Sequence, residues 1–260
     1  MNIKLRTVLL SIAAPVTAVA FSVGMSSIVL LIAGSNPLEA YSDMIQHASK
    51  LETQIDILNR ATPLYISGVA AAIGFRMNLF NIGVEGQYLL AALFAAAVGG
   101  AVSLPTVLHI SLIFIVGMAV GSAYAGVAGW MKTSRGINEV ISTIMLNGIA
   151  ISGLVAWLVR RWQAGGSVDA TTGSASIGTE PIDDSGLLPD ITSWLEVFTR
   201  DVKQGKQLTG VLVVAAVVGV AYYVLLNRTR FGFDLRATGI NPFAARAGGI
   251  APKRMVLYTM

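Results

Sequence analysis

The sequence predicts an all-α membrane protein, a polytopic bundle of transmembrane helices, on three observations. Of its 260 residues, 54% are hydrophobic and 12% are charged, whereas about 25% of the residues in a soluble domain are charged. Several apolar runs are long enough to cross a bilayer, which takes ~20 residues in a helix. The 18 Lys and Arg residues lie between these runs and not in one basic patch, so they indicate membrane topology and no nucleic-acid partner.

The first apolar run, residues 8–32, is predicted to be a retained transmembrane helix. A secretory signal has an apolar core of roughly 7 to 15 residues, which this run exceeds. Pro15 predicts a kink in it. The run 63–75 is short for a full crossing, so it is predicted to be a broken or partial helix inside the bundle. Further spans are predicted near residues 82–100, 107–131, 140–159 and 208–226.

The distribution of charge predicts a cytoplasmic N-terminus. In this orientation most basic residues, including those of the loop 227–253, lie on the cytoplasmic side, and most acidic residues lie outside. This is the bias that the positive-inside rule describes. Arg160 and Arg161 depart from it, because the same orientation places them outside.

Two outer segments are predicted. Residues 36–62 carry a weak helical pattern and are expected to lie along the membrane surface. Residues 163–207 form a long acidic connection, in which the apolar stretch 191–198 predicts a short interfacial helix. Partner docking and a merely solvated loop are both open for this second segment. Together with the spans they form a single transmembrane domain, residues 1–260.

Small residues recur at every fourth position in two of the predicted spans. Such a face lets two helix backbones come into van der Waals contact, which is the main source of helix association in lipid. We therefore expect these residues to pack helices together and not to line a substrate path. The two series are Ala91, Ala95 and Gly99, then Gly117, Gly121, Ala125 and Gly129.

The sequence contains no motif for resident chemistry. It lacks a phosphate-binding loop, a zinc-protease motif and a nucleophile elbow, and it has no cysteine. His47 and His109 each stand alone, and an isolated histidine is more often structural than a ligand. We therefore predict no catalytic residue, no metal site and no cofactor.

Glu85 is a carboxylate between apolar residues, within the polar run 81–87. An ionised side chain in hydrocarbon costs about 2.5 to 3.5 kcal/mol on insertion scales, so it is a functional-site hypothesis by default. Glu85 could bind a polar substrate, or it could bond to Asn81, Gln87 or Asn147 and hold a broken helix in shape. The structural role is favoured, because a lone carboxylate without a paired cation suits a neutral sugar or nucleoside poorly. Asn147 is the better lining candidate, since amides orient hydrogen bonds without demanding a charge.

Three polar runs, separated by predicted spans, carry a resemblance to a known family. Residues 81–87 read Asn-Ile-Gly-Val-Glu-Gly-Gln, and residues 138–147 read Asn-Glu-Val-Ile-Ser-Thr-Ile-Met-Leu-Asn. With residues 235–250, they resemble the permease subunits of ABC importers of the branched-chain amino acid and simple-sugar superfamily. The first two runs are most similar to the nucleoside and simple-sugar uptake branch. Such permeases continue with further spans, so this chain is expected to be truncated at its C-terminal end.

The resemblance implies a permease that translocates a nucleoside or a related sugar-like solute and hydrolyses nothing itself. It implies a bacterial cytoplasmic (inner) membrane, with its lipids as surroundings. The implied partners are a second permease subunit, a cytoplasmic ABC ATPase and an extracytoplasmic substrate-binding lipoprotein. The residues predicted to line the substrate pathway are Asn81, Glu85, Gln87 and Asn147. A different class stays open, namely a secondary transporter that uses Glu85 as the site for its coupling proton or sodium ion.

Residues 241–249 predict a short helix on the cytoplasmic side. Proline is favoured at the first helical position and glycine just after the last, and the sequence has Asn241-Pro242 and Gly248-Gly249 in these places. By resemblance this helix corresponds to the coupling helix that sits on the ATPase; the alternative is an ordinary cytoplasmic turn. The predicted coupling residues are Asn241, Pro242, Ala244, Ala245, Arg246, Gly248 and Gly249. Glu139, after a polar turn, is interpreted as an acid at a helix N-terminus, where it is favourable.

Overall fold

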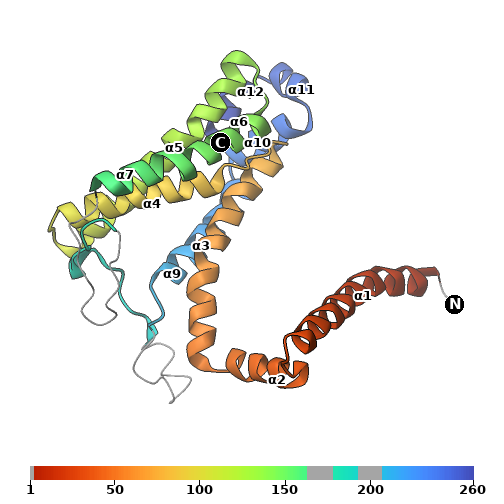
Figure 1. Ribbon diagram of the computed structural model, residues 1–260. Coiled ribbons are helices and arrows are strands. Elements are labelled where there is room, and N and C mark those ends of the chain that lie inside the picture. Colours follow the sequence, from red (N-terminus) through yellow and green to blue (C-terminus); the bar gives the residue numbers. More distant parts are fainter. Residues whose placement is uncertain (1–2, 163–177, 193–206) are drawn as a thin grey trace. The chain divides into compact units, whose positions relative to one another are not determined.

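The computed structural model describes residues 3–162, 178–192 and 207–260 (Figure 1). Within these ranges the chain is helical, and an isolated bridge between Asp190 and Thr209 is the extent of its β-pairing. The predicted all-α class is confirmed. The chain divides into two compact units, Met1–Ile57 and Leu58–Met260; the prediction of one domain over residues 1–260 stays a prediction.

The first unit contains the long helix α1 (Ile3–Ile32) and the short helix α2 (Pro37–Ala48). Asn36 caps α2, since its side chain accepts a hydrogen bond from the Leu38 backbone N–H at 3.1 Å. The Tyr41 hydroxyl donates to the Val23 carbonyl oxygen at 3.1 Å, which holds α2 against α1. Leu38, Met44 and Ile45 of α2 are exposed, as a helix lying on a membrane surface would require.

Helix α3 (Leu51–Arg76) corrects one prediction. The expected short or broken helix over residues 63–75 is the second half of this longer, unbroken helix. Pro63 lies inside it and removes one backbone N–H, a defect that a helix with many other bonds tolerates. Hydrogen bonds to a distant part of the chain also hold α3 just before Pro63. The Asn59 side chain donates to the Gln207 carbonyl oxygen at 2.9 Å and accepts from the Thr209 N–H at 3.2 Å.

Helices α4 (Val84–Ala101) and α5 (Thr106–Arg135) form an antiparallel pair. A Cβ atom built on Gly121 would lie 3.6 Å from the Ala91 Cβ, and one built on Gly117 would lie 3.8 Å from the Ala95 Cβ. The two small-residue series therefore pack against each other, and the structural interpretation of these glycines is confirmed.

The rest of the second unit continues the bundle. Helix α6 (Glu139–Gly148), the π-helix η1 (Ile149–Val155) and α7 (Ala156–Trp162) form one helical path. After η2 (Asp184–Gly186) come α9 (Val211–Arg228), α10 (Arg230–Ile240), α11 (Pro242–Ala247) and α12 (Pro252–Thr259). The predicted segment 163–207, with its expected interfacial helix at 191–198, lies largely outside the described residues.

Among the described residues, five helical stretches are long and apolar enough to cross a membrane. They are Ile12–Ile32, Val84–Ala101, Thr106–Arg135, Glu139–Trp162 and Val211–Arg228. These agree with the spans predicted from sequence, apart from α3, which does not meet the same measure of length and apolarity. The chain is thus a multi-pass membrane protein.

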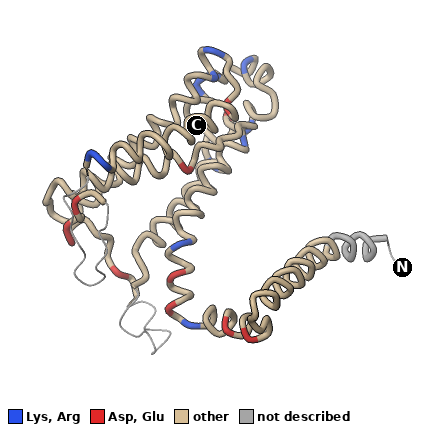
Figure 2. The backbone as a smooth tube through the Cα atoms, viewed as in Figure 1, with Lys and Arg blue, Asp and Glu red and all other residues tan. Residues whose placement is uncertain are grey.

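The second unit has two chemically different ends. At one end, which we call the α11 end, the ends of α3 and α5 meet α10, α11 and α12, and Lys and Arg gather there (Figure 2). Its core consists of the buried side chains Met77, Leu79, Leu226, Leu235 and Met255.

The other end, which we call the η2 end, is organised by a buried histidine. The His109 side chain is fully buried, with Nε2 at 2.9 Å from the Gly99 carbonyl oxygen and Nδ1 at 2.8 Å from the Ser185 hydroxyl. A carbonyl oxygen can only accept, so Nε2 carries a proton. The structural role expected of His109 is confirmed, since it ties α4, α5 and η2 together.

Candidate functional site

The polar loop between α3 and α4 folds around an amide pair. Asn81 and Gln87 exchange two hydrogen bonds through their side-chain amides, each at 3.3 Å. The Asn81 side-chain oxygen also accepts a hydrogen bond from the Gly83 backbone N–H at 2.9 Å. This ring of bonds fixes the entry of the chain into α4, where backbone N–H groups lack helical partners.

Helix α6 supplies the second wall of this site. The Thr143 hydroxyl, which is fully buried, accepts from the Ile82 backbone N–H at 3.2 Å and donates to the Glu139 carbonyl oxygen at 2.7 Å. One turn further on, the Asn147 side-chain oxygen accepts from the Gly86 backbone N–H. Thr143 and Asn147 are four residues apart and so share one helix face. This spacing could have identified Thr143 from the sequence, which our interpretation missed.

The close approach of α4 to this face depends on Gly86. A Cβ atom there would lie 2.8 Å from both the Ala150 Cβ and the Asn147 side-chain oxygen. No larger side chain fits without separating the helices. We call Asn81, Gln87, Thr143 and Asn147 the amide cluster.

Glu85 lies outside the amide cluster. Its side chain is exposed in the isolated chain, and within the described ranges no hydrogen bond or ion pair involves it. The amide cluster therefore holds the start of α4 without the scaffold bonds that we considered for Glu85. Of the four residues predicted for the pathway, Asn81, Gln87 and Asn147 come together, and Glu85 does not join them.

Glu139 has the position predicted for it and a partner that was not predicted. It is the first residue of α6, after the cap Asn138, whose side chain accepts from the Val140 N–H at 2.8 Å. Its carboxylate is nearly buried and forms an ion pair with Lys132 in the last turn of α5. The pair closes the turn between α5 and α6, so Glu139 is structural.

The short helix predicted over residues 241–249 is present as α11. The Asn241 side chain accepts from the N–H groups of Phe243 and Ala244, at 2.9 and 3.1 Å. At the other end the Gly248 N–H donates to the Ala244 carbonyl oxygen at 3.0 Å, and Gly249 has a φ of +84°, which glycine adopts without strain. Local sequence signals therefore set both limits of this helix.

The exposure of α11 revises which residues could meet a partner. Ala245 points into the protein and is 5% exposed, whereas Phe243 is 84% exposed. Ala244 and Arg246 are also exposed. Phe243 was not among the predicted coupling residues; it and Ile240, which is 86% exposed, are large apolar side chains presented together at this end, and exposed apolar patches mark interaction sites.

The described part of the chain offers no site for a metal. Within it, no three acidic or histidine side chains come together as metal binding would require. The polar groups that are available are amides, hydroxyls and backbone groups, which bind neutral hydroxylated molecules.

Residues 54–260 match the family described as the permease component of the branched-chain amino acid transport system. The chain belongs to this family. It is 31% identical over 248 residues, 94% of the chain, to the glucose ABC transporter permease protein TsgB13 of Haloferax volcanii. It is also similar to two further proteins: the guanosine ABC transporter permease protein NupP of Bacillus subtilis (26% identical, over 95% of the chain) and the nucleoside ABC transporter permease protein NupB of Lactococcus lactis (29% identical, over 100% of the chain).

The chain spans 62%, 66% and 68% of the lengths of these three relatives. No solved structure matches it. The family resemblance that the three polar runs predicted is confirmed. Membership places the chain among the permease components of transport systems, and its apolar spans agree with this.

Proposed function

We propose that this permease is the membrane subunit of an ATP-driven ABC importer and translocates a nucleoside or a related sugar-like solute. Its family supports the transport role, and relatives named for guanosine, nucleosides and glucose support the solute class. Both solute types are neutral and rich in hydroxyl groups, which suits a polar site built from amides. The family match favours this function over ion-coupled transport through Glu85.

The observation that carries the proposal is helix α11. It is a short, capped helix at the basic α11 end of the second unit, and its exposed side chains include Phe243. A cytoplasmic ABC ATPase would hold this helix, and ATP binding would move it. The side chains available for this contact are Pro242, Phe243, Ala244 and Arg246, while Asn241, Gly248 and Gly249 define the helix and Ala245 anchors it.

The remaining partners follow from the family. A second permease subunit would complete the pathway, and an extracytoplasmic substrate-binding lipoprotein would deliver the solute. We place the protein in a bacterial cytoplasmic (inner) membrane with its N-terminus in the cytoplasm. Lys132 and Lys253 lie together at the α11 end, so this orientation puts that end on the positive side that the charge bias requires.

For the solute pathway we propose the amide cluster, and Asn147 within it. The Asn147 oxygen accepts from the Gly86 N–H, which fixes the orientation of the amide because a backbone N–H can only donate. Its NH₂ group has no hydrogen-bond partner in the described part of the chain. A hydroxyl group of a passing nucleoside or sugar could accept from it.

Uptake of radiolabelled guanosine and glucose tests the proposal. Cells that express the complete transporter are compared with the same cells after deletion of the ATPase gene. We expect concentrative uptake of one of the two solutes, with loss of uptake on deletion. Concentrative uptake that continues without the ATPase would refute an ATP-driven mechanism.

A further inference from the structure

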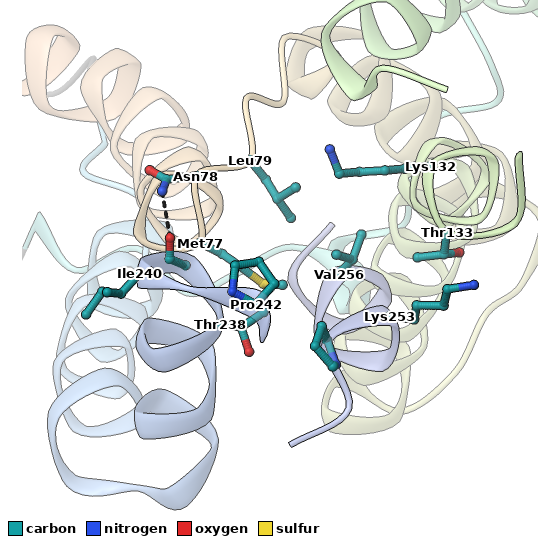
Figure 3. A pocket seen from close by; sticks show the side chains of 12 residues that line it. Met77, Asn78, Leu79, Lys132, Thr133, Thr238, Ile240, Pro242, Lys253 and Val256 are labelled. Carbon is teal, nitrogen blue, oxygen red and sulfur yellow. Dashed lines mark hydrogen bonds between the residues drawn. The ribbon is translucent and has the colours of Figure 1, made fainter. Parts of the chain in front are cut away.

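The C-terminal end of α3 is joined to α10 by an unusual side chain. Asn78 has a φ of +55° and is the one non-glycine residue with positive φ in the described ranges. Residues with a Cβ rarely adopt this left-handed conformation, although asparagine tolerates it better than most. In this conformation the Asn78 amide donates to the Gly239 carbonyl oxygen at 2.7 Å, across 161 residues of sequence (Figure 3).

Gly239 makes the second half of this contact. A Cβ atom at Gly239 would lie 2.8 Å from the Met77 Cα and still closer to the Arg76 carbonyl oxygen. The backbone of α10 therefore rests directly on the backbone at the end of α3, a separation that only glycine allows. We call Asn78 and Gly239 the α3–α10 latch.

The latch lies between the two functional regions. On one side, Gly239 precedes Asn241, the residue that caps α11, by two positions. On the other side, Asn78 begins the loop that leads to Asn81 in the amide cluster and then to Ile82, whose N–H is bonded to Thr143. The path from α11 to the amide cluster is therefore a few residues of backbone and one side-chain hydrogen bond.

The latch is next to buried core side chains on one side and next to a cavity on the other. Met77 and Leu79 belong to the same buried core as Leu235 of α10, so the loop and α10 share their packing. On the open side is a cavity of about 450 Å³, lined by Asn78, Gly239, Pro242 and Val256 among others (Figure 3). Because well-packed interiors resist deformation, this free volume gives the base of α11 room to move.

We propose that the α3–α10 latch transmits displacement of α11 to the start of α4, which makes Asn78 a positioning residue for transport. This inference rests on the proposed function. When α11 moves, the C-terminal end of α10 moves with it, and the Asn78 hydrogen bond together with the Gly239 contact makes the loop after α3 follow. The amide cluster is then opened or closed by rigid packed elements.

Two variants break the latch in different ways. Asn78→Asp keeps a residue that tolerates positive φ but replaces the donor with a carboxylate, which can only accept. Asn78→Gly removes the side chain and its hydrogen bond, while glycine adopts the positive φ at this position without strain. The matched control is Asn227→Asp, because Asn227 also donates to a backbone carbonyl oxygen, that of Tyr223 at 3.0 Å, but within a single helix.

The first measurement is the amount of guanosine or glucose taken up per ATP hydrolysed, with the complete transporter in proteoliposomes. This ratio does not depend on how much protein folds. For both Asn78 variants we expect it to fall about fivefold, the population shift that corresponds to one net hydrogen bond, while Asn227→Asp keeps the parent ratio. A parent ratio in both Asn78 variants would overturn the proposal.

The second measurement needs no solute. The chain has no cysteine, so Ile82→Cys, at a side chain that is 40% exposed, introduces a single thiol in the loop. Its rate of labelling by a maleimide is compared with and without vanadate-trapped ATP. We expect trapping to change the rate with the latch intact and to leave it unchanged with Asn78→Asp. If trapping changes the labelling rate equally with Asn78 and with Asn78→Asp, or does not change it with Asn78, the proposed role of the latch is overturned. Uptake by the parent that does not need ATP would instead refute the proposed function.

Discussion

Gly86→Ala tests the contact on which the amide cluster depends. The new Cβ would start 2.8 Å from the Ala150 Cβ, whereas carbon atoms in good contact are about 3.5 to 4.0 Å apart. Helix α4 must then withdraw by roughly 0.7 to 1.2 Å, because the Ala150 Cβ is attached directly to the backbone. Overpacking of this kind costs about 1 to 3 kcal/mol.

The same withdrawal weakens the bond from the Gly86 N–H to Asn147, which is worth about 1 kcal/mol. A total of about 2 to 4 kcal/mol lowers the apparent Tm by roughly 4 to 16 °C in a chain of this size. The assay is thermal unfolding of the purified protein in detergent. Gly148→Ala is the matched control, because a Cβ at Gly148 meets no atom within 4 Å.

A rescue separates the clash from other effects of the substitution. Ala150→Gly removes one of the two colliding groups, so the double variant Gly86→Ala/Ala150→Gly should regain part of the lost stability. If Gly86→Ala is as stable as Gly148→Ala, or if the second substitution restores nothing, the close packing of α4 on α6 and η1 is refuted.

Three further predictions concern helix α11, Glu85 and Lys132. Phe243→Asp, at an exposed position of α11, should abolish co-purification of the ATPase without lowering the apparent Tm, whereas Ala245→Arg, at a buried position, should lower the apparent Tm. Glu85→Gln should leave the uptake rate near that of the parent, because the Glu85 carboxylate has no partner among the described residues. Lys132→Ala should lower thermal stability by about 1 to 3 kcal/mol, since it leaves the nearly buried Glu139 carboxylate unpaired.

Each of these predictions has an outcome that contradicts it. Retention of the ATPase by Phe243→Asp would remove that residue from the docking surface. Complete loss of uptake in Glu85→Gln, with normal expression, would show a charge-dependent role. If Lys132→Ala is as stable to heat as the parent and as the double variant Lys132→Ala/Glu139→Gln, the ion pair contributes nothing to stability.

Local signals explain what the sequence predicted well. The length of the apolar runs identified the spans, because bilayer thickness fixes the length that is needed. The pairs Asn241-Pro242 and Gly248-Gly249 predicted both ends of α11, because caps act within one helical turn. The small-residue series predicted which helix faces pack closely, because helical periodicity is local, but not that α4 and α5 pack against each other.

Long-range contacts explain what the sequence did not predict. The latch joins residues 161 positions apart, and the Gly86 bond to Asn147 joins residues 61 apart. Neither pairing leaves a pattern in the sequence. The run 63–75 illustrates the opposite error, because its short apolar length predicted a broken or partial helix, whereas α3 continues without a break from Leu51 to Arg76. Glu85 was conspicuous as a charge, yet the neighbouring amides form the contacts.

The central claim, that ATP drives transport through this permease, is tested most directly in proteoliposomes that contain the complete transporter. The measurement is the initial rate of uptake of radiolabelled guanosine or glucose with ATP supplied to the ATPase, in the presence and absence of ionophores that collapse proton and sodium gradients. The account predicts uptake that requires ATP and is unaffected by the ionophores. Uptake that proceeds without ATP and stops when the gradients are collapsed would contradict it.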